Sequence, residues 1–75
     1  MDTLTTAFRI KSLCNSRKIT IKSLLENTAI NRNFMYDLEK CGQSPSADKL
    51  ERIADYLEVS VDYLLGRTDN PEINQ

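Results

Sequence analysis

The sequence predicts an all-α fold, a compact bundle of five short helices. Apolar residues recur at helical spacing, polar N-cap residues precede several apolar runs, and no segment alternates apolar and polar residues as a strand would. A chain of 75 residues has room for one domain with a small core. Because the connections between the predicted helices are short, the helices are expected to pack against one another.

The first two predicted helices lie in the N-terminal third of the chain. One covers about residues 3–17 and buries one apolar face. The residues of that face follow helical spacing: Ala7, Ile10, Leu13 and Cys14. Thr20 then offers an N-cap for a short second helix, which ends near residue 27 and carries Leu24 and Leu25.

The third predicted helix covers residues 31–40 and follows a tight connection at residues 28–30. Asn31 is its expected N-cap, because asparagine accepts hydrogen bonds from the free amides of a first turn. Met35 and Leu38 are spaced to line its inner face.

A loop separates the third helix from the two helices that close the predicted domain. Ser46 is the expected N-cap of the fourth helix, whose apolar positions have helical spacing: Leu50, Ile53, Ala54 and Leu57. Ser60 caps a fifth helix that ends at Gly66. We therefore expect a domain of residues 1–66 and a flexible, mostly polar tail of residues 67–75.

The composition excludes much enzyme chemistry. There is no histidine, so the chain can build neither an imidazole-activated nucleophile nor an imidazole metal site. Two cysteines cannot complete a structural zinc site, and two glycines are too few for a phosphate-cradling loop. We expect no enzyme, no metal, no cofactor and no small-molecule substrate. No apolar run is long enough to span a membrane and no leader is visible, so a cytoplasmic protein is expected.

Charge is distributed unevenly along the chain. The net charge is −1, from ten Lys and Arg against eleven Asp and Glu. Residues 1–40 hold seven basic and four acidic side chains, a net +3, and residues 41–75 hold three basic and seven acidic ones, a net −4. An acidic chain can therefore present a basic face to phosphate. The alternative is ordinary scatter over a solvated surface.

Residues 20–40 have the layout of a helix-turn-helix, which is a capped helix, a short connection and a second capped helix. A long ordered motif follows and includes LEKCGQSPSADKLERIADYLEVSVDYLLG. On these residues the chain, over about residues 5–66, resembles the Cro and phage-repressor (XRE) helix-turn-helix family. The positions that match are Leu38, Glu39, Pro45, Leu50, Ile53, Ala54, Val59, Ser60, Asp62, Tyr63, Leu64 and Gly66.

This resemblance implies a lambda-repressor-like DNA-binding domain. The implied function is sequence-specific transcriptional regulation by a repressor of phage, mobile-element or bacterial origin. The partner would be a double-stranded DNA operator, with helix 31–40 in the major groove. Because a fold does not determine a function, a second class of function stays open, in which the helix-turn-helix binds a protein, as an antirepressor or antitoxin-like adaptor does. That alternative is favoured by the near-neutral net charge, by the aromatic Phe34 and Tyr36, by Asp37, and by the absence of a glutamine and an arginine that the family usually has.

The chain departs from the family pattern at four positions. Cys14 stands where the family usually has an arginine that pairs with the equivalent of Glu39, so Glu39 must find another partner or remain solvated. Ile21 replaces a glutamine that touches phosphate, and Leu25 replaces a small alanine. Ala29 replaces the glycine of the turn, where a positive φ costs alanine about 1 kcal/mol relative to glycine. We therefore expect an altered turn, with the change taken up at residues 27–28.

Four residues of the third helix are expected to read bases by this resemblance: Arg32, Asn33, Phe34 and Asp37. Arginine can fork onto guanine, asparagine can bond adenine, phenylalanine can pack on a thymine methyl, and aspartate can accept from cytosine. Arg32 and Asn33 are also consistent with solvated surface positions. Phe34 is also consistent with a core or protein-interface position, and Asp37 with a pair to the lysine three residues later.

Phosphate contacts position a protein on DNA without reading its sequence. The candidates for these contacts are Thr20, Lys22, Asn31, Tyr36, Lys40, Gln43 and Ser44. Lys22 and Lys40 have the greatest electrostatic reach, although each is equally consistent with a solvated charge.

A homodimer on an inverted-repeat operator is expected, because one helix-turn-helix contacts only a few base pairs. The resemblance places the interface near the fifth helix and the preceding loop, with four candidates: Leu57, Val61, Tyr63 and Leu64. The alternative is that Val61 and Leu64 close the core of the monomer.

Overall fold

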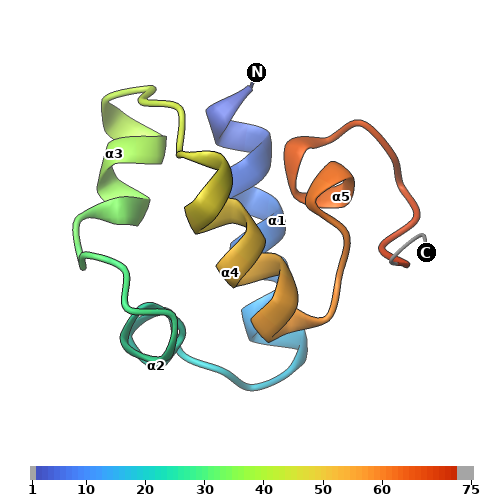
Figure 1. The fold of residues 1–75 in the computed structure, drawn as a ribbon. Coiled ribbons are helices and arrows are strands. Elements are labelled where there is room, and N and C mark those ends of the chain that lie inside the picture. The colour runs from blue at the N-terminus through green and yellow to red at the C-terminus, as the bar shows by residue number, and fades with distance from the viewer. Residues whose placement is uncertain (1, 73–75) are drawn as a thin grey trace.

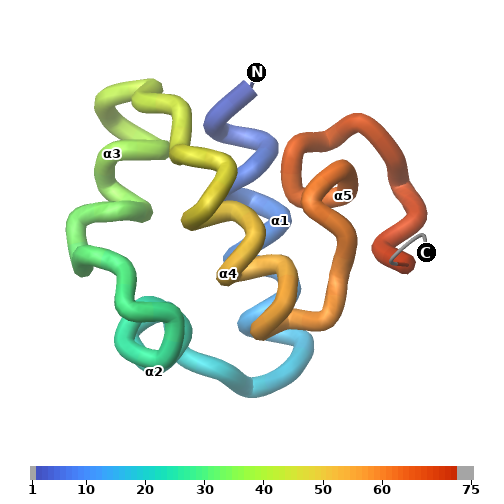
Figure 2. Tube along the Cα trace, in the orientation of Figure 1, coloured from blue at the N-terminus to red at the C-terminus, as the bar shows by residue number. Residues whose placement is uncertain are grey.

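The computed structural model describes residues 2–72, and this part of the chain forms five helices and no strand. They are α1 (Thr3–Ser16), α2 (Ile21–Asn27), α3 (Phe34–Lys40), α4 (Ala47–Leu57) and α5 (Val61–Leu65). Figure 1 shows α3 and α5 on opposite sides of α1, with α4 in front and α2 across one end. The chain trace of Figure 2 shows how short the connections are. The predicted all-α bundle of five helices is confirmed.

A single apolar core lies between the helices, and α1 is its central element, in contact with α2, α3 and α5. Its largest fully buried apolar side chains come from every helix: Ile10, Cys14, Leu24, Leu38, Ile53, Leu57, Val59 and Leu64. Cys14 is a free thiol in this core, and burial raises its pKa, against the opposing effect of Arg17. Cys14 therefore acts as a small apolar residue rather than as a reactive thiolate.

Side-chain caps begin four of the five helices. The hydroxyls of Thr20, Ser46 and Ser60 accept the amides of Ser23, Lys49 and Tyr63 at 3.0, 3.3 and 3.0 Å. These three caps are where the sequence predicts them. α1 is capped by Asp2, whose carboxylate accepts the amides of Leu4 and Thr5. A hydrogen bond from the Thr5 hydroxyl to this carboxylate lowers the pKa of Asp2.

The start of α3 differs from the prediction of a helix over 31–40. The helix begins at Phe34, with Asn33 as its N-cap. The Oδ1 atom of Asn31 accepts the amide of Asn33 at 2.8 Å, and the Asn31 carbonyl accepts the amide of Phe34 at 3.0 Å. Because the Asn31 side chain stabilises this local turn, it delays the helix instead of capping its first turn.

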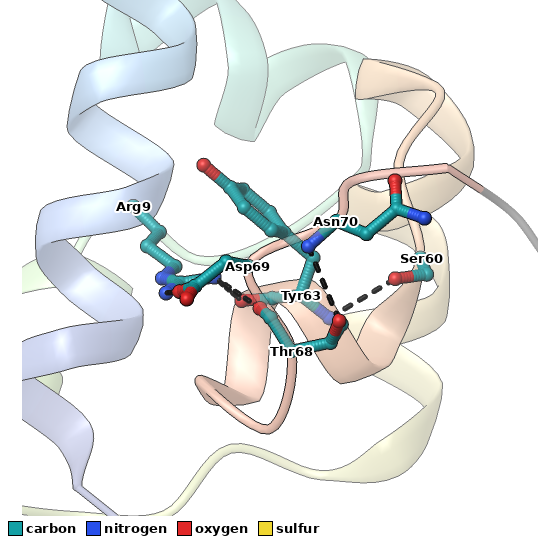
Figure 3. A network of polar contacts seen from close by, with 6 residues as sticks. All are labelled: Arg9, Ser60, Tyr63, Thr68, Asp69 and Asn70. Atoms are coloured by element: carbon teal, nitrogen blue, oxygen red, sulfur yellow. Dashed lines mark hydrogen bonds and ion pairs between the residues drawn. The ribbon is translucent and has the colours of Figure 1, made fainter.

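The Arg9 side chain fastens the segment after α5 to α1. Its guanidinium donates to the carbonyls of Tyr63 and Thr68 at 2.9 and 2.6 Å and pairs with the Asp69 carboxylate at 2.9 Å. It also lies 4.2 Å from the centre of the Tyr63 ring, within the range of a cation–π contact. Figure 3 shows these groups converging on the guanidinium.

The segment after α5 lies against the rest of the fold. Besides the Arg9 contacts, the Ser60 amide donates to the Pro71 carbonyl at 2.9 Å. The prediction of a flexible tail over 67–75 stays a prediction, and the structure adds that residues 67–71 make hydrogen bonds to α1, α5 and Ser60. Residues 73–75 lie outside the described part of the chain.

We expect the substitution Arg9→Met to lower the free energy of unfolding by about 2 kcal/mol. Methionine keeps the apolar stem but removes a charged hydrogen-bond donor and the cation–π contact. Chemical denaturation measures this loss, and hydrogen exchange should accelerate at the Ser60 amide. Asp69→Asn is the control and should change stability by less than about 1 kcal/mol, because an exposed ion pair contributes little. Unchanged exchange at Ser60 in Arg9→Met would contradict the account.

Candidate nucleic-acid interface

The helices α2 and α3 form a braced pair. Leu24 and Leu25 of α2 share one core cluster with Met35 and Leu38 of α3. Leu25 is only 4% exposed, so the core accommodates the side chain that replaces the small residue of the family pattern. Because both helices are anchored by buried side chains, the outer surface of α3 has a fixed orientation relative to the rest of the fold.

Hydrogen bonds from two side chains, Thr28 and Arg52, stabilise the turn between α2 and α3. The Thr28 hydroxyl, which is buried, donates to the Leu24 carbonyl at 2.7 Å. From α4, the Arg52 guanidinium donates to the carbonyls of Thr28 and Ala29 at 3.3 and 3.5 Å and pairs with Asp48 at 2.6 Å. Sequence reasoning missed Arg52, because nothing in the local pattern indicates a contact from α4 to this turn.

Ala29 adopts a left-handed backbone conformation with φ of +56°. The expectation that residues 27–28 would absorb the loss of the family's glycine is therefore wrong. Asn27 ends α2 and Thr28 has a φ of −100°, so the turn keeps its left-handed residue at position 29. The contacts from Thr28 and Arg52 stabilise this conformation against the cost of alanine's side chain.

Three of the four predicted base-reading residues lie at the N-terminal end of α3 in accessible positions. Arg32 and Asn33 are exposed, and the Asn33 side chain makes no capping hydrogen bond. Asp37 is half-buried, and its carbonyl accepts the Gln43 amide at 3.0 Å. Within residues 2–72, Asp37 forms no ion pair with Lys40, so the simple pairing considered from the sequence is not made.

Phe34 does not belong to this accessible group. Its side chain is 5% exposed and packs in the core with Met35 and Leu38. Because α3 begins at Phe34, this residue falls on the inner face, at helical spacing from Leu38. The placement of Phe34 on the presenting surface is therefore wrong, and the core alternative describes it. The exposed aromatic residue of α3 is Tyr36, at 60%.

A polar hollow of about 400 Å³ lies between the start of α3, the following loop and the start of α4. Its polar lining brings together residues that are distant in sequence: Asn31, Asn33, Asp37, Gln43, Ser44, Ser46 and Lys49. Asn31, Gln43 and Ser44 were predicted to contact phosphate, and all three are exposed. Lys49 was not predicted, although a lysine in the first turn after the proline-containing loop is a usable signal.

A second hollow, of about 650 Å³, lies beside α2 and brings Lys22 next to Arg32. Both side chains are exposed, so two positive charges from different elements share one surface, next to the carboxylate of Glu26. Thr20, at the start of α2, is also exposed. Its oxygen accepts the Ser23 amide, and its O–H is still free to donate.

Ion pairs explain how an acidic chain keeps a basic face. The bases that are paired with acids are Arg9, Lys11, Arg52 and Arg67. Among residues 2–72, four bases on the helix-turn-helix side form no ion pair: Lys22, Arg32, Lys40 and Lys49. Glu39 pairs with Lys11 at 2.7 Å, so it has found a partner in place of the family's arginine. Pairing therefore neutralises Glu39 and Asp48 near α3, and the acidic groups that remain beside the four unpaired bases are Glu26 and Asp37.

The predicted dimer residues divide into two kinds. Leu57 and Leu64 have no exposed surface, because both complete the monomer core, and their assignment to an interface is wrong for this conformation. Val61 and Tyr63 are half-buried. The Tyr63 ring also lies under the Arg9 guanidinium, which restricts access to it.

Comparison with known proteins identifies relatives of the chain. Residues 9–70 match the Cro/C1-type HTH DNA-binding domain. An uncharacterized HTH-type transcriptional regulator, YobD of Bacillus subtilis (strain 168), is 36% identical over 64 residues, which are 85% of this chain and 57% of YobD. The immunity repressor protein of Bacillus phage phi105 is 32% identical over 63 residues, 84% of this chain and 44% of that protein. No solved structure matches the chain significantly.

These matches confirm the resemblance inferred from the sequence, and the matched family is one of DNA-binding domains rather than enzymes. The chain spans about half the length of these relatives. The match extends beyond residue 66, in agreement with the attachment of the segment after α5. None of the helices in the described residues is long and apolar enough to cross a membrane.

We expect Ala29→Gly to raise the free energy of unfolding by about 1 kcal/mol. Glycine adopts the positive φ of this turn without the steric cost that a Cβ atom incurs. Chemical denaturation measures the gain. Ala7→Gly, inside α1, is the control and should lower stability by about 1 kcal/mol or more. Loss of stability in Ala29→Gly would show that the turn does not require a left-handed residue.

Proposed function

Because the chain belongs to the Cro/C1-type helix-turn-helix DNA-binding family, we propose that it is a transcriptional regulator that represses genes from a specific operator. The operator would be an inverted repeat bound by a homodimer. The phage phi105 relative is named an immunity repressor and the Bacillus subtilis relative a transcriptional regulator, which supports this proposal. The natural setting is the cytoplasm of a bacterial cell or of a phage-infected host.

One observation carries the proposal most directly. Four basic side chains without an ion pair among the described residues lie on α2, α3, the turn between them and the start of α4: Lys22, Arg32, Lys40 and Lys49. DNA binding draws most of its free energy from such contacts with phosphate, through release of counterions. The net charge of −1 does not oppose this, because exposed charges separated by more than a Debye length of about 10 Å are largely screened.

In this proposal the N-terminal end of α3 enters the major groove. Arg32 forks onto guanine, Asn33 bonds adenine, and Asp37 accepts from the amino group of cytosine. The side chains of Arg32 and Asn33 are exposed, and the Asn33 side chain makes no capping hydrogen bond, so both are accessible to a base edge. Phe34 has no base-reading role, because it is buried.

Phosphate contacts on both sides of α3 would fix its orientation. Their candidates are Thr20, Lys22, Asn31, Tyr36, Lys40, Gln43 and Ser44, with Lys49 added by its position in the polar hollow. Asn31 uses its oxygen to accept the Asn33 amide, which leaves its amino group as a donor to phosphate.

The alternative function, binding of a protein by the helix-turn-helix, loses part of its support. Part of its support came from two aromatic residues expected on the presenting surface, and one of them, Phe34, lies in the core. Tyr36 remains exposed, but a tyrosine hydroxyl is equally suited to a phosphate contact.

The experiment that tests the proposal measures binding to random duplex DNA across a salt series and then selects preferred sequences from a pool. We expect log K to fall with log salt with a slope of about −3 to −4 per protomer, since each neutralised phosphate contributes about −0.9. The selected sequences should contain an inverted repeat. Absence of binding even at low salt would overturn the proposal in favour of a protein partner.

We expect Arg32→Ala and Asn33→Ala each to weaken binding to the selected operator by about 1–3 kcal/mol while leaving random DNA less affected. Each substitution removes a contact to a base edge rather than only a contact to the backbone. Titration of both DNAs measures the ratio of affinities. Lys22→Ala is the control and should weaken both affinities similarly and reduce the salt slope by about 1. An unchanged specificity ratio in both variants would contradict the assignment.

A further inference from the structure

The connection between α2 and α3, residues 28–33, carries two of the proposed base-reading residues. Arg32 and Asn33 both precede Phe34, the first residue of α3, and both are exposed. Buried side chains anchor α3 itself, but the backbone that leads into it lies outside the helical ladder of hydrogen bonds. The direction of these two side chains therefore depends on the contacts that fix the connection.

We infer that Arg52 of α4 is a positioning residue for operator recognition. It holds this connection in the conformation that presents Arg32 and Asn33 to the bases, and it does not itself touch DNA. The inference rests on the proposed function, because it concerns how the same surface discriminates between DNA sequences. It gives a role in recognition to a residue outside the helix-turn-helix.

The backbone hydrogen bonds of the turn determine where α2 ends but leave two carbonyls without an amide. The Ile30 amide donates to the Leu25 carbonyl at 2.9 Å. The Ala29 amide donates to the Glu26 carbonyl at 3.3 Å, and this pair of bonds is common where a left-handed residue ends a helix. Within residues 2–72, the carbonyls of Thr28 and Ala29 receive no backbone amide.

Arg52 supplies the donors for these two carbonyls from a different helix. Its Nη1 atom donates to the Thr28 and Ala29 carbonyls at 3.3 and 3.5 Å, while Nη2 pairs with the Asp48 carboxylate at 2.6 Å. Because the guanidinium is a rigid planar fork, the ion pair orients the nitrogen that faces the turn. In the described part of the chain, no other side chain outside α2 and the connection donates a hydrogen bond to residues 28–33.

The position of Arg52 separates it from the surface that would meet DNA. It lines a hollow of about 570 Å³ together with Ala29 and Tyr56. It lines neither of the two hollows that contain several of the proposed DNA-binding residues. Because its donors are directed at two turn carbonyls and at Asp48, the guanidinium fixes the geometry of the neighbouring base readers instead of binding phosphate.

The first test removes the contact without changing the net charge. In the double variant Asp48→Asn with Arg52→Met, both members of the ion pair lose their charge, so the field at the DNA surface changes little. We expect its affinity for a duplex with one half-site of the selected operator to fall about tenfold, roughly the loss of one base contact. Its affinity for a scrambled duplex of the same length and its salt slope should stay at the wild-type values, since no phosphate contact is lost.

Two control variants separate positioning from charge. Asp48→Asn alone should keep the ratio of half-site to scrambled affinity, because an asparagine oxygen can still accept from Arg52. Asp62→Asn with Arg67→Met removes an ion pair of the same two residue types beside α5 and should change neither affinity. Partial unfolding does not imitate the expected result, because it lowers the apparent affinity for both duplexes by the same factor.

Two results would overturn the positioning role. One is a wild-type affinity ratio in the double variant that lacks Asp48 and Arg52. The other is an equal loss of affinity for both duplexes with the salt slope reduced by about 0.9, which would show that Arg52 binds phosphate directly.

A second test needs no DNA and compares the backbone amide NMR signals of the free wild type and the free double variant. We expect shifts at the amides of Arg32 and Asn33 as well as in the turn, with the signals of residues 36–40 unchanged. Shifts that stop at Ala29 and Ile30 would show that the contact is only local and would overturn the inference.

The two tests also distinguish this inference from the proposed function. If the wild type binds neither duplex, the regulator proposal fails and the positioning role fails with it, whatever the free protein shows. If the wild type prefers the half-site and the double variant prefers it equally, the regulator proposal stands and only the role of Arg52 is wrong.

Discussion

The chain changes direction sharply between α2 and α3, as Figure 1 shows, and the left-handed backbone of Ala29 lies in that turn. The turn is stabilised by the buried Thr28 hydroxyl from within and by Arg52 from α4. Because α3 follows directly, the direction in which Arg32 and Asn33 point depends on this turn. The ion pair of Arg52 with Asp48 couples the turn to the first part of α4, which also carries Lys49. One set of hydrogen bonds thus aligns the proposed base-reading and phosphate-binding groups.

The net charge of the chain indicates the charge of its DNA-facing surface only when the ion pairs between its side chains are known. The sum over the chain is −1, and the uneven distribution in sequence suggested a basic half. The structure refines that suggestion, since Arg9 and Lys11 belong to the basic half but are bound to Asp69 and Glu39. Lys49 belongs to the acidic half and yet joins the basic surface beside α3. The local field that DNA would meet is therefore set by tertiary contacts rather than by position along the chain.

The features that the sequence predicts well are local ones. The caps at Thr20, Ser46 and Ser60 and the five helices follow from neighbouring residues. The start of α3 was misplaced because Asn31 has two competing uses, as a helix cap and as a turn former, and the choice depends on context. The attachment of the segment after α5 was missed because Arg9 lies more than fifty positions away in sequence. Burial of Phe34 was missed because it depends on where α3 begins, whereas the helical spacing of Leu57 with Leu50, Ile53 and Ala54 already fits the core position that the structure gives it.

The central claim is that the surface formed by α2, α3 and the start of α4 binds DNA. Its most direct test follows the backbone amide NMR signals of the full chain during titration with a duplex that contains the selected operator. The account predicts the largest shifts at residues 20–23 and 31–49, with small shifts in the segment that Arg9 holds beside α5. Shifts confined to residues outside that surface, or none under conditions that saturate binding, would contradict it.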